Sequence, residues 1–183
     1  MNTCIYFVRH AESPYIEGME RTRGLSEKGR LDSLQVSELL KKEHIDIFCS
    51  SPYERAIQTI QAAAGEKEIL LFEDLKEREL GQISEWTFKD AKLKLYTDIH
   101  YAFPEGESTF SAQKRANKVM LTILNEHKGK NIVIGTHGDI MTLMLNDFDK
   151  RFDFSFWAST TMPDIYKIEF QELIFVKADR LWR

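Results

Sequence analysis

Cysteine is scarce in this sequence, and a long apolar run is missing. Cys4 and Cys49 are the only two thiols among 183 residues, and their spacing matches no CxxC metal or redox motif. Each lies in an apolar segment, where a reduced thiol packs as a small hydrophobe, so a structural disulfide is not expected. No stretch approaches the ~20 apolar residues of a membrane-spanning helix, and no basic segment precedes the apolar start of the chain. These absences favour a cytoplasmic protein with no membrane partner.

An excess of one charge is also missing. The 25 lysine and arginine residues face 29 aspartate and glutamate residues, which gives a formal net charge of -4. Such a chain has no overall attraction for nucleic acid or for an anionic lipid surface, so neither is expected as a partner. An anion-binding site in this protein must therefore be a local cluster of cationic side chains.

Repeats, low-complexity tracts and flexible linkers do not interrupt the chain, and its four prolines lie at junctions between expected elements. With 43% hydrophobic residues, a chain of this length suits a single globular core. We therefore expect residues 1–183 to form one domain. The oligomeric state stays open, because apolar C-terminal strands suit either an internal core or a dimer interface.

Short apolar runs rich in β-forming residues alternate with segments of helical periodicity. We expect strands at residues 3–8, 45–49, 69–72, 131–136, 165–170 and 173–182, and helices at residues 26–42, 87–95, 108–127 and 139–148, with one more helix after Pro52. This alternation predicts an α/β fold. The expected architecture is a three-layer α/β/α sandwich with a mainly parallel central sheet and a C-terminal antiparallel hairpin.

Apolar spacing also predicts which helix faces meet the core. The first predicted helix is supported by the approximate helical spacing of Leu31, Leu34, Leu39 and Leu40, and the 108–127 helix is expected to bury a stripe that begins with Phe110. Ser51 and Pro52 are interpreted as the N-cap and the first residue of the helix that follows the second strand.

Three of the expected strands lead into side chains able to hold an anion. Arg9 and His10 follow the first strand, Arg55 falls in the first turn after the second, and His137 with Gly138 follows the strand at 131–136. Ligands of open α/β sheets bind beyond the carboxyl ends of the strands, so we expect these groups to meet. A neutral imidazole beside a guanidinium suits attack on phosphorus, because the guanidinium grips two phosphate oxygens. Taken singly, each has an ordinary alternative: a polar strand end, a solvated arginine, or a core histidine with its hydrogen bonds satisfied.

Six segments carry a family resemblance. In chain order they are FVRHAES, GLSEKGR, SPYERAIQT, DLKERELG, PEGES and VIGTHGD, and together they span residues 7–139. As an ordered set they resemble the motifs of the histidine phosphatase superfamily, in its phosphoglycerate mutase-like branch with the Arg-His-Gly motif. The resemblance implies an α/β sandwich that transfers phosphate through a phosphohistidine.

The resemblance also implies a role for each matching residue. It makes His10 the nucleophile, Glu77 the general acid and base, and His137 a catalytic residue that also binds phosphate together with Arg9 and Arg55. A phosphate monoester carries a charge of about −1.5 to −2, which this set of cationic and donor groups suits. The arginines supply the positive charge that a metal supplies in other phosphatases, so neither a metal nor another cofactor is implied.

A metal site is the competing interpretation of the same strand ends. His10 with Glu12, and His137 with Asp139, place two metal-binding side chain types near each other in the sequence. Neither spacing matches a metal-ligand signature, and both pairs straddle a strand end where alternation between faces lapses. We therefore expect no metal ligands among these residues.

The loop after the first motif separates the candidate reactions. Its sequence PYIEGMERTRG lacks the Trp-Asn pair that contacts substrate in the family's mutases, and Ala11 replaces the usual glycine. The resemblance, with this departure, favours hydrolysis of a small phosphorylated metabolite, a phosphomonoester, by a metal-independent phosphatase. A cofactor-dependent phosphoglycerate mutase and a catalytically silent phospho-ligand binding module are the alternatives. Ser13, Arg21, Arg23 and Gly138 are further candidates for substrate contact, and the identity of the substrate stays open because specificity lies in loops.

Overall fold

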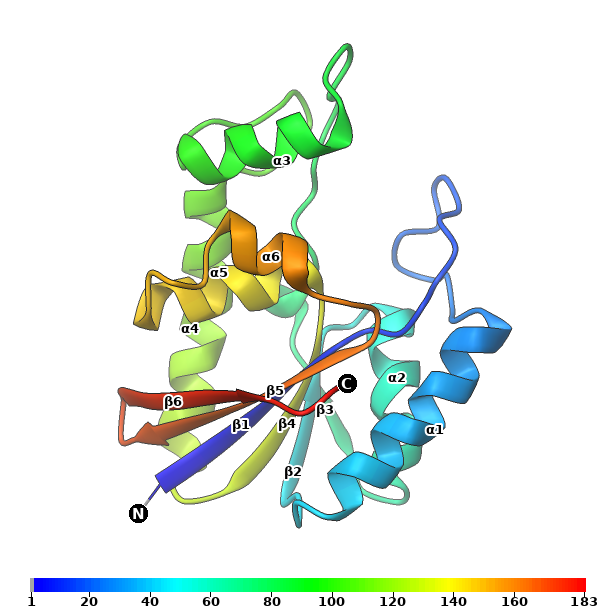
Figure 1. Cartoon of the computed structure of the whole chain (residues 1–183), viewed down its shortest axis with the longest axis vertical. Coiled ribbons are helices and arrows are strands. Elements are labelled where there is room, and N and C mark those ends of the chain that lie inside the picture. Colours follow the sequence, from blue (N-terminus) through cyan, green and yellow to red (C-terminus); the bar gives the residue numbers. More distant parts are fainter. Residues whose placement is uncertain (1) are drawn as a thin grey trace.

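Six strands form one sheet in the computed structural model, which describes residues 2–183 (Figure 1). The strands are β1 (Asn2–Arg9), β2 (Ile47–Ser50), β3 (Ile69–Leu71), β4 (Asn131–Thr136), β5 (Asp164–Gln171) and β6 (Ile174–Arg180). Their order across the sheet is β3-β2-β4-β1-β5-β6. β5 runs antiparallel to both of its neighbours, and the remaining pairs are parallel. The predicted mainly parallel sheet with a C-terminal hairpin is confirmed.

Helices cover both faces of this sheet (Figure 1). They are α1 (Glu27–Lys41), α2 (Glu54–Ala64), α3 (Phe88–Thr97), α4 (Thr109–Glu126), α5 (Gly138–Phe148) and α6 (Phe154–Ser159), with a short 3-10 turn at Glu73–Leu75. Alternation along β1 divides the core in two: Ile5 and Phe7 pack with residues of α4 and α5, whereas Tyr6 and Val8 pack with residues of α1 and α2. The predicted three-layer sandwich is therefore confirmed.

The buried face of α1 includes only some of the leucines whose spacing predicts the helix. Leu31 and Leu34 are 60% and 55% exposed, whereas Leu40 is buried. The helix instead buries a stripe that includes Gly29, Val36 and Leu40. A Cβ at Gly29 would come within 2.3 Å of a carbonyl oxygen in the preceding loop. Close backbone packing at this glycine decides which face turns inward, and Leu31 and Leu34 are left outside.

Other local predictions are also corrected. Phe110 is 47% exposed and packs against the ring of His100, while its neighbours Thr109 and Ala112 in the first turn of α4 are buried. α2 begins at Glu54 with Tyr53 at the N-cap, so Ser51 is not the N-cap and Pro52 is not the first helical residue. The short helix α6 was not expected from the sequence. Within residues 2–183, no helix has the length and apolar character needed to cross a membrane.

Candidate active site

Two histidines from distant parts of the chain lie side by side at one edge of the sheet. β1 and β4 are parallel neighbours, and their register pairs Arg9 with Thr136. The residue after each of these is a histidine, and the backbone N–H of His10 donates to the Thr136 carbonyl at 2.9 Å. The ring centroids of His10 and His137 are 5.4 Å apart in an edge-on arrangement. The expected meeting of the strand ends is thus observed for this pair.

His10 is held as a neutral imidazole with a defined tautomer. Its Nδ1 lies 2.7 Å from the carbonyl oxygen of Ala11, and a carbonyl only accepts, so Nδ1 must carry the proton. Nε2 is then the nitrogen with a free lone pair. Burial, reinforced by the Arg55 guanidinium, lowers the pKa of His10 to about 3. The side chain is therefore uncharged at neutral pH, with Nε2 unprotonated.

His137 lies at the N-cap position of α5 and is fully buried. Its Nε2 lies 2.8 Å from the hydroxyl of Ser51. Ser51 therefore contacts this histidine and does not cap the helix as predicted. Burial and then the Arg55 charge lower the pKa of His137 well below its usual value. The other ring nitrogen, Nδ1, is buried without a hydrogen-bond partner among residues 2–183.

Arg9 approaches the start of α5 closely. One terminal nitrogen donates to the carbonyl and the hydroxyl of Thr160, at 3.2 and 2.6 Å. A Cβ on Gly138 would come within 2.9 Å of the Arg9 guanidinium carbon, so this position has no room for a side chain. Gly138 therefore acts on the site by letting Arg9 lie against the helix terminus.

Arg55 lies in the first turn of α2, as predicted, and only 1% of it is exposed. Its two terminal nitrogens donate to Glu20, one to the backbone carbonyl and one to carboxylate Oε1, both at 2.6 Å. The guanidinium also lies over the ring of Tyr53, 4.9 Å from its centroid. Burial lowers the pKa of Arg55, but a guanidinium stays charged at any physiological pH.

Buried donors without partners concentrate at this point of the molecule. Six buried side-chain nitrogen or oxygen atoms in residues 2–183 have no hydrogen-bond partner, and three of them belong to this cluster. They are Nε of Arg9, Nε of Arg55 and Nδ1 of His137. An unsatisfied buried polar group costs about 1–3 kcal/mol, so their concentration in one cluster indicates a place built to receive an acceptor.

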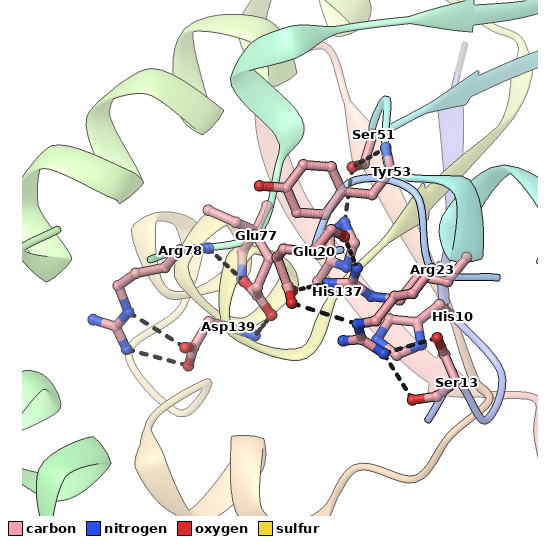
Figure 2. Close-up of polar contacts among 12 residues, drawn as sticks. His10, Ser13, Glu20, Arg23, Ser51, Tyr53, Glu77, Arg78, His137 and Asp139 are labelled. Carbon is pink, nitrogen blue, oxygen red and sulfur yellow. Dashed lines mark hydrogen bonds and ion pairs between the residues drawn. The ribbon is translucent and has the colours of Figure 1, made fainter. Parts of the chain in front are cut away.

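Glu77 lies at the N-terminus of α5, across from the histidines (Figure 2). Its Oε1 accepts the backbone N–H groups of Arg78 and Ile140, and its Oε2 accepts that of Asp139, at 2.9 to 3.1 Å. Arg115 anchors the backbone that leads to Glu77, because its guanidinium donates to the carbonyls of Asp74, Lys76 and Glu77. Burial, and next the Asp139 charge, raise the pKa of Glu77. The neighbouring acids Glu73, Asp74 and Glu79 are exposed, as expected.

Asp139 is the centre of a buried polar network beside Glu77. Its carboxylate pairs with Arg78 and Lys92 and accepts a 3.0 Å hydrogen bond from the hydroxyl of Tyr96. Burial alone would raise the pKa of Asp139, but Lys92 and Arg78 outweigh it and hold the value at about 2. Asp139 therefore stays ionised and presents a fixed negative charge next to Glu77.

Residues 14–24 bring one of their two arginines into the site. Arg23 donates to the carbonyl and hydroxyl of Ser13, both at 2.7 Å, and its side chain is 11% exposed. Arg21 points outward, where it pairs with Glu73 and is 52% exposed. Ser13, Arg23 and Gly138 thus lie at the cluster, whereas Arg21 lies at its rim, with its guanidinium carbon 5.6 Å from the centroid of the Tyr53 ring.

Glu20 is the residue at this site that the sequence reasoning missed. It binds Arg55 and also lies 3.4 Å from Nε of Arg23. The sequence offers little signal for it, because the loop carries Glu17 as well and no periodicity distinguishes the two. Among residues 2–183, no three His, Cys, Asp or Glu side chains gather in a way that would hold a metal ion.

An α/β protein whose strand ends bring two imidazoles and two guanidiniums around one buried point is of a class suited to binding oxyanions. Comparison with known proteins identifies the family. A family model for the histidine phosphatase superfamily (branch 1) matches residues 5–172, and the chain belongs to this family. The sequence is 31% identical to Phosphoglycerate mutase-like protein 4 of Arabidopsis thaliana over 156 residues, which cover 75% of this chain and 67% of that protein.

Solved structures share the fold. A mycobacterial glucosyl-3-phosphoglycerate phosphatase superposes with a TM-score of 0.77 at 18% identity, over 98% of each chain. A phosphoserine phosphatase from Entamoeba histolytica, in complex with 3-phosphoglyceric acid, gives a TM-score of 0.78 at 24% identity, over 95% of this chain and 94% of its own. At such identities the similarity establishes a common architecture.

Proposed function

We propose that this protein is a phosphomonoesterase that hydrolyses a small phosphorylated metabolite through a phosphohistidine on His10. The observation that carries the proposal is the set of three buried, unpartnered nitrogens of Arg9, Arg55 and His137 around a neutral His10. Phosphate oxygens are the acceptors that such donors suit best, since two guanidiniums balance a charge of about −1.5 to −2. The names of the related phosphatases support a metabolite as substrate.

The first step transfers the phosphoryl group to the enzyme. Nε2 of His10 attacks phosphorus, a nitrogen–phosphorus bond forms, and the bond from phosphorus to the ester oxygen breaks. Glu77 gives its proton to the departing alkoxide. The Oε2 atom of Glu77 accepts one N–H and Oε1 accepts two, so Oε2 has the greater free capacity for this proton. His137, Arg9 and Arg55 hold the other phosphate oxygens.

The second step returns the enzyme to its starting state. The ionised Glu77 takes a proton from water, the water oxygen attacks phosphorus, and the nitrogen–phosphorus bond breaks to release inorganic phosphate and neutral His10. The arginines supply the positive charge that balances the negative equatorial oxygens in both steps, so the scheme uses no metal ion. Each step leaves charge and protons balanced.

Turnover of p-nitrophenyl phosphate by the wild type and by His10→Ala, in the presence of a chelator, tests the proposal. We expect His10→Ala to lose turnover while an exposed control, His100→Ala, keeps it, with thermal unfolding used to confirm that both variants fold. A panel of phosphorylated metabolites then defines the substrate, and a coupled phosphoglycerate isomerisation assay separates hydrolysis from mutase activity. Full turnover by a folded His10→Ala variant, or saturable phosphate binding by a wild type without any turnover, would refute the proposed function.

A further inference from the structure

The Glu20 carboxylate holds the same arginine that we assign to the substrate. Its Oε1 lies 2.6 Å from a terminal nitrogen of Arg55, and its Oε2 lies 3.4 Å from Nε of Arg23. Figure 2 draws Glu20 in the middle of the site, among Tyr53, His137 and Arg23. A carboxylate on a guanidinium uses the same planar pairing as a phosphate, so the two anions compete for one partner.

The surroundings of Glu20 allow its side chain to leave without disturbing the loop. Its backbone carbonyl is anchored separately, by the other terminal nitrogen of Arg55 at 2.6 Å. The next residue is also anchored, because the Arg21 carbonyl accepts the backbone N–H of Glu54 at 3.0 Å. The Glu20 side chain is 45% exposed, so rotation about its own bonds carries the carboxylate into solvent.

The burial of Arg55 makes this rotation necessary for phosphate binding. Arg55 is 1% exposed and one of its terminal nitrogens is taken by the Glu20 carboxylate, so a phosphate oxygen can pair with that nitrogen only after the carboxylate moves aside. Among the residues that contact Arg55, Glu20 combines partial exposure with a side chain held only by ionic hydrogen bonds. Such a contact to a partly exposed carboxylate is weak, and a phosphate that reaches two arginines and two histidines outcompetes it.

We propose that Glu20 is a built-in competitor of the substrate phosphate: its carboxylate occupies Arg55, must swing out when phosphate binds, and thereby sets the affinity of the site for anions. This inference rests on the proposed function for its substrate and adds a specificity-determining residue to it. Glu20 raises the concentration of phosphate needed to fill the site, so it limits inhibition by the product. It also disfavours small carboxylates as ligands, because a carboxylate that displaces Glu20 from Arg55 forms a contact no stronger than the one it removes.

The Glu20→Gln variant tests the inference, with Glu17→Gln as the matched control. Both changes remove one negative charge from the same loop, but Glu17 is exposed and lies away from Arg55 contacts. Binding of inorganic phosphate is measured by calorimetry, which needs no turnover, and KM and kcat are measured with p-nitrophenyl phosphate. We expect Glu20→Gln to lower both the dissociation constant of phosphate and KM by about tenfold without raising kcat, whereas Glu17→Gln changes them by less than about twofold.

The outcomes separate this inference from the proposed function. Unchanged or weaker phosphate binding in Glu20→Gln would overturn the inference, because it would make Glu20 a residue that only orients Arg55. An equal gain in Glu17→Gln would overturn it too, since net charge alone would then explain the effect. If the wild type turns over no ester but Glu20→Gln still binds phosphate more tightly, the proposed hydrolysis fails and the competition stands.

Discussion

The Glu77→Gln substitution removes the transferable proton of this residue and keeps its shape and two of its three backbone contacts. Glutamine has the same shape, and its one carbonyl oxygen can still accept the N–H groups of Arg78 and Ile140 that Oε1 accepts now. What it loses is the transferable proton and the acceptor for the Asp139 N–H. The amide nitrogen of the new side chain would face that N–H, donor against donor.

The lost proton should lower activity, and the lost acceptor should lower stability. Leaving-group protonation contributes ~10²- to 10⁴-fold, so kcat/KM for an alkyl phosphate should fall by about that factor. p-Nitrophenolate departs as a stable anion and needs little help, so the loss with its ester should be about tenfold or less. The unmatched N–H at Asp139 should lower the free energy of unfolding by about 1–3 kcal/mol.

The assay compares kcat/KM for glycerol phosphate and p-nitrophenyl phosphate in the wild type, Glu77→Gln and the exposed neighbour control Glu79→Gln. Urea denaturation gives the change in stability for each variant. An equal loss with both esters in a folded Glu77→Gln protein would refute the assignment of Glu77 as proton donor, since the defect would then lie in binding or positioning.

Two further predictions follow from burial. The pKa of His10 is held near 3, below its ordinary 6.5, so its contribution to stability is present above pH 6.5 and is lost as the pH falls toward 3. Between about pH 6 and 4, urea denaturation should show the wild type losing up to about 1.4 kcal/mol per pH unit more than His10→Gln, and parallel profiles would contradict the burial of a neutral imidazole. On α1, Val36→Ala should cost about 2 kcal/mol of unfolding free energy and Leu34→Ala less than about 0.5 kcal/mol, because only Val36 is buried. The reverse order would mean that α1 is rotated on the sheet.

Much of the fold was predictable because its strands are buried on both faces. The strand expected at residues 131–136 is observed as Asn131–Thr136, and the polar residues that end β1 and β4 follow their apolar runs directly. Parallel pairing then brings these ends to one edge, so the meeting of His10, Arg55 and His137 follows from strand order. Glu77 was placed by motif resemblance, and the structure adds the contacts of its carboxylate with the start of α5.

What escaped prediction depends on tertiary contacts with no local signature. The spacing of leucines along α1 does not show which face is buried, and the close approach of Gly29 to a neighbouring loop leaves Leu31 and Leu34 outside. Ser51 has the composition of a helix cap, but its hydroxyl is drawn to His137, a residue 86 positions away. The role of Glu20 depends on the path of an irregular loop, which no hydrophobic pattern determines.

β1 lies between β4 and β5 in the sheet, and this position fixes the register of the residues that end in His10. β1 is paired along its length with both β4 and β5, so a slip of one residue would turn Arg9 to the opposite face and carry the adjoining imidazole with it. Residues 14–24, in contrast, add nothing to the sheet. The exposed positions of this loop can therefore change without shifting the register that places the two histidines. A library randomised at those positions should consist mostly of folded proteins, and under the proposed function they should differ in substrate preference.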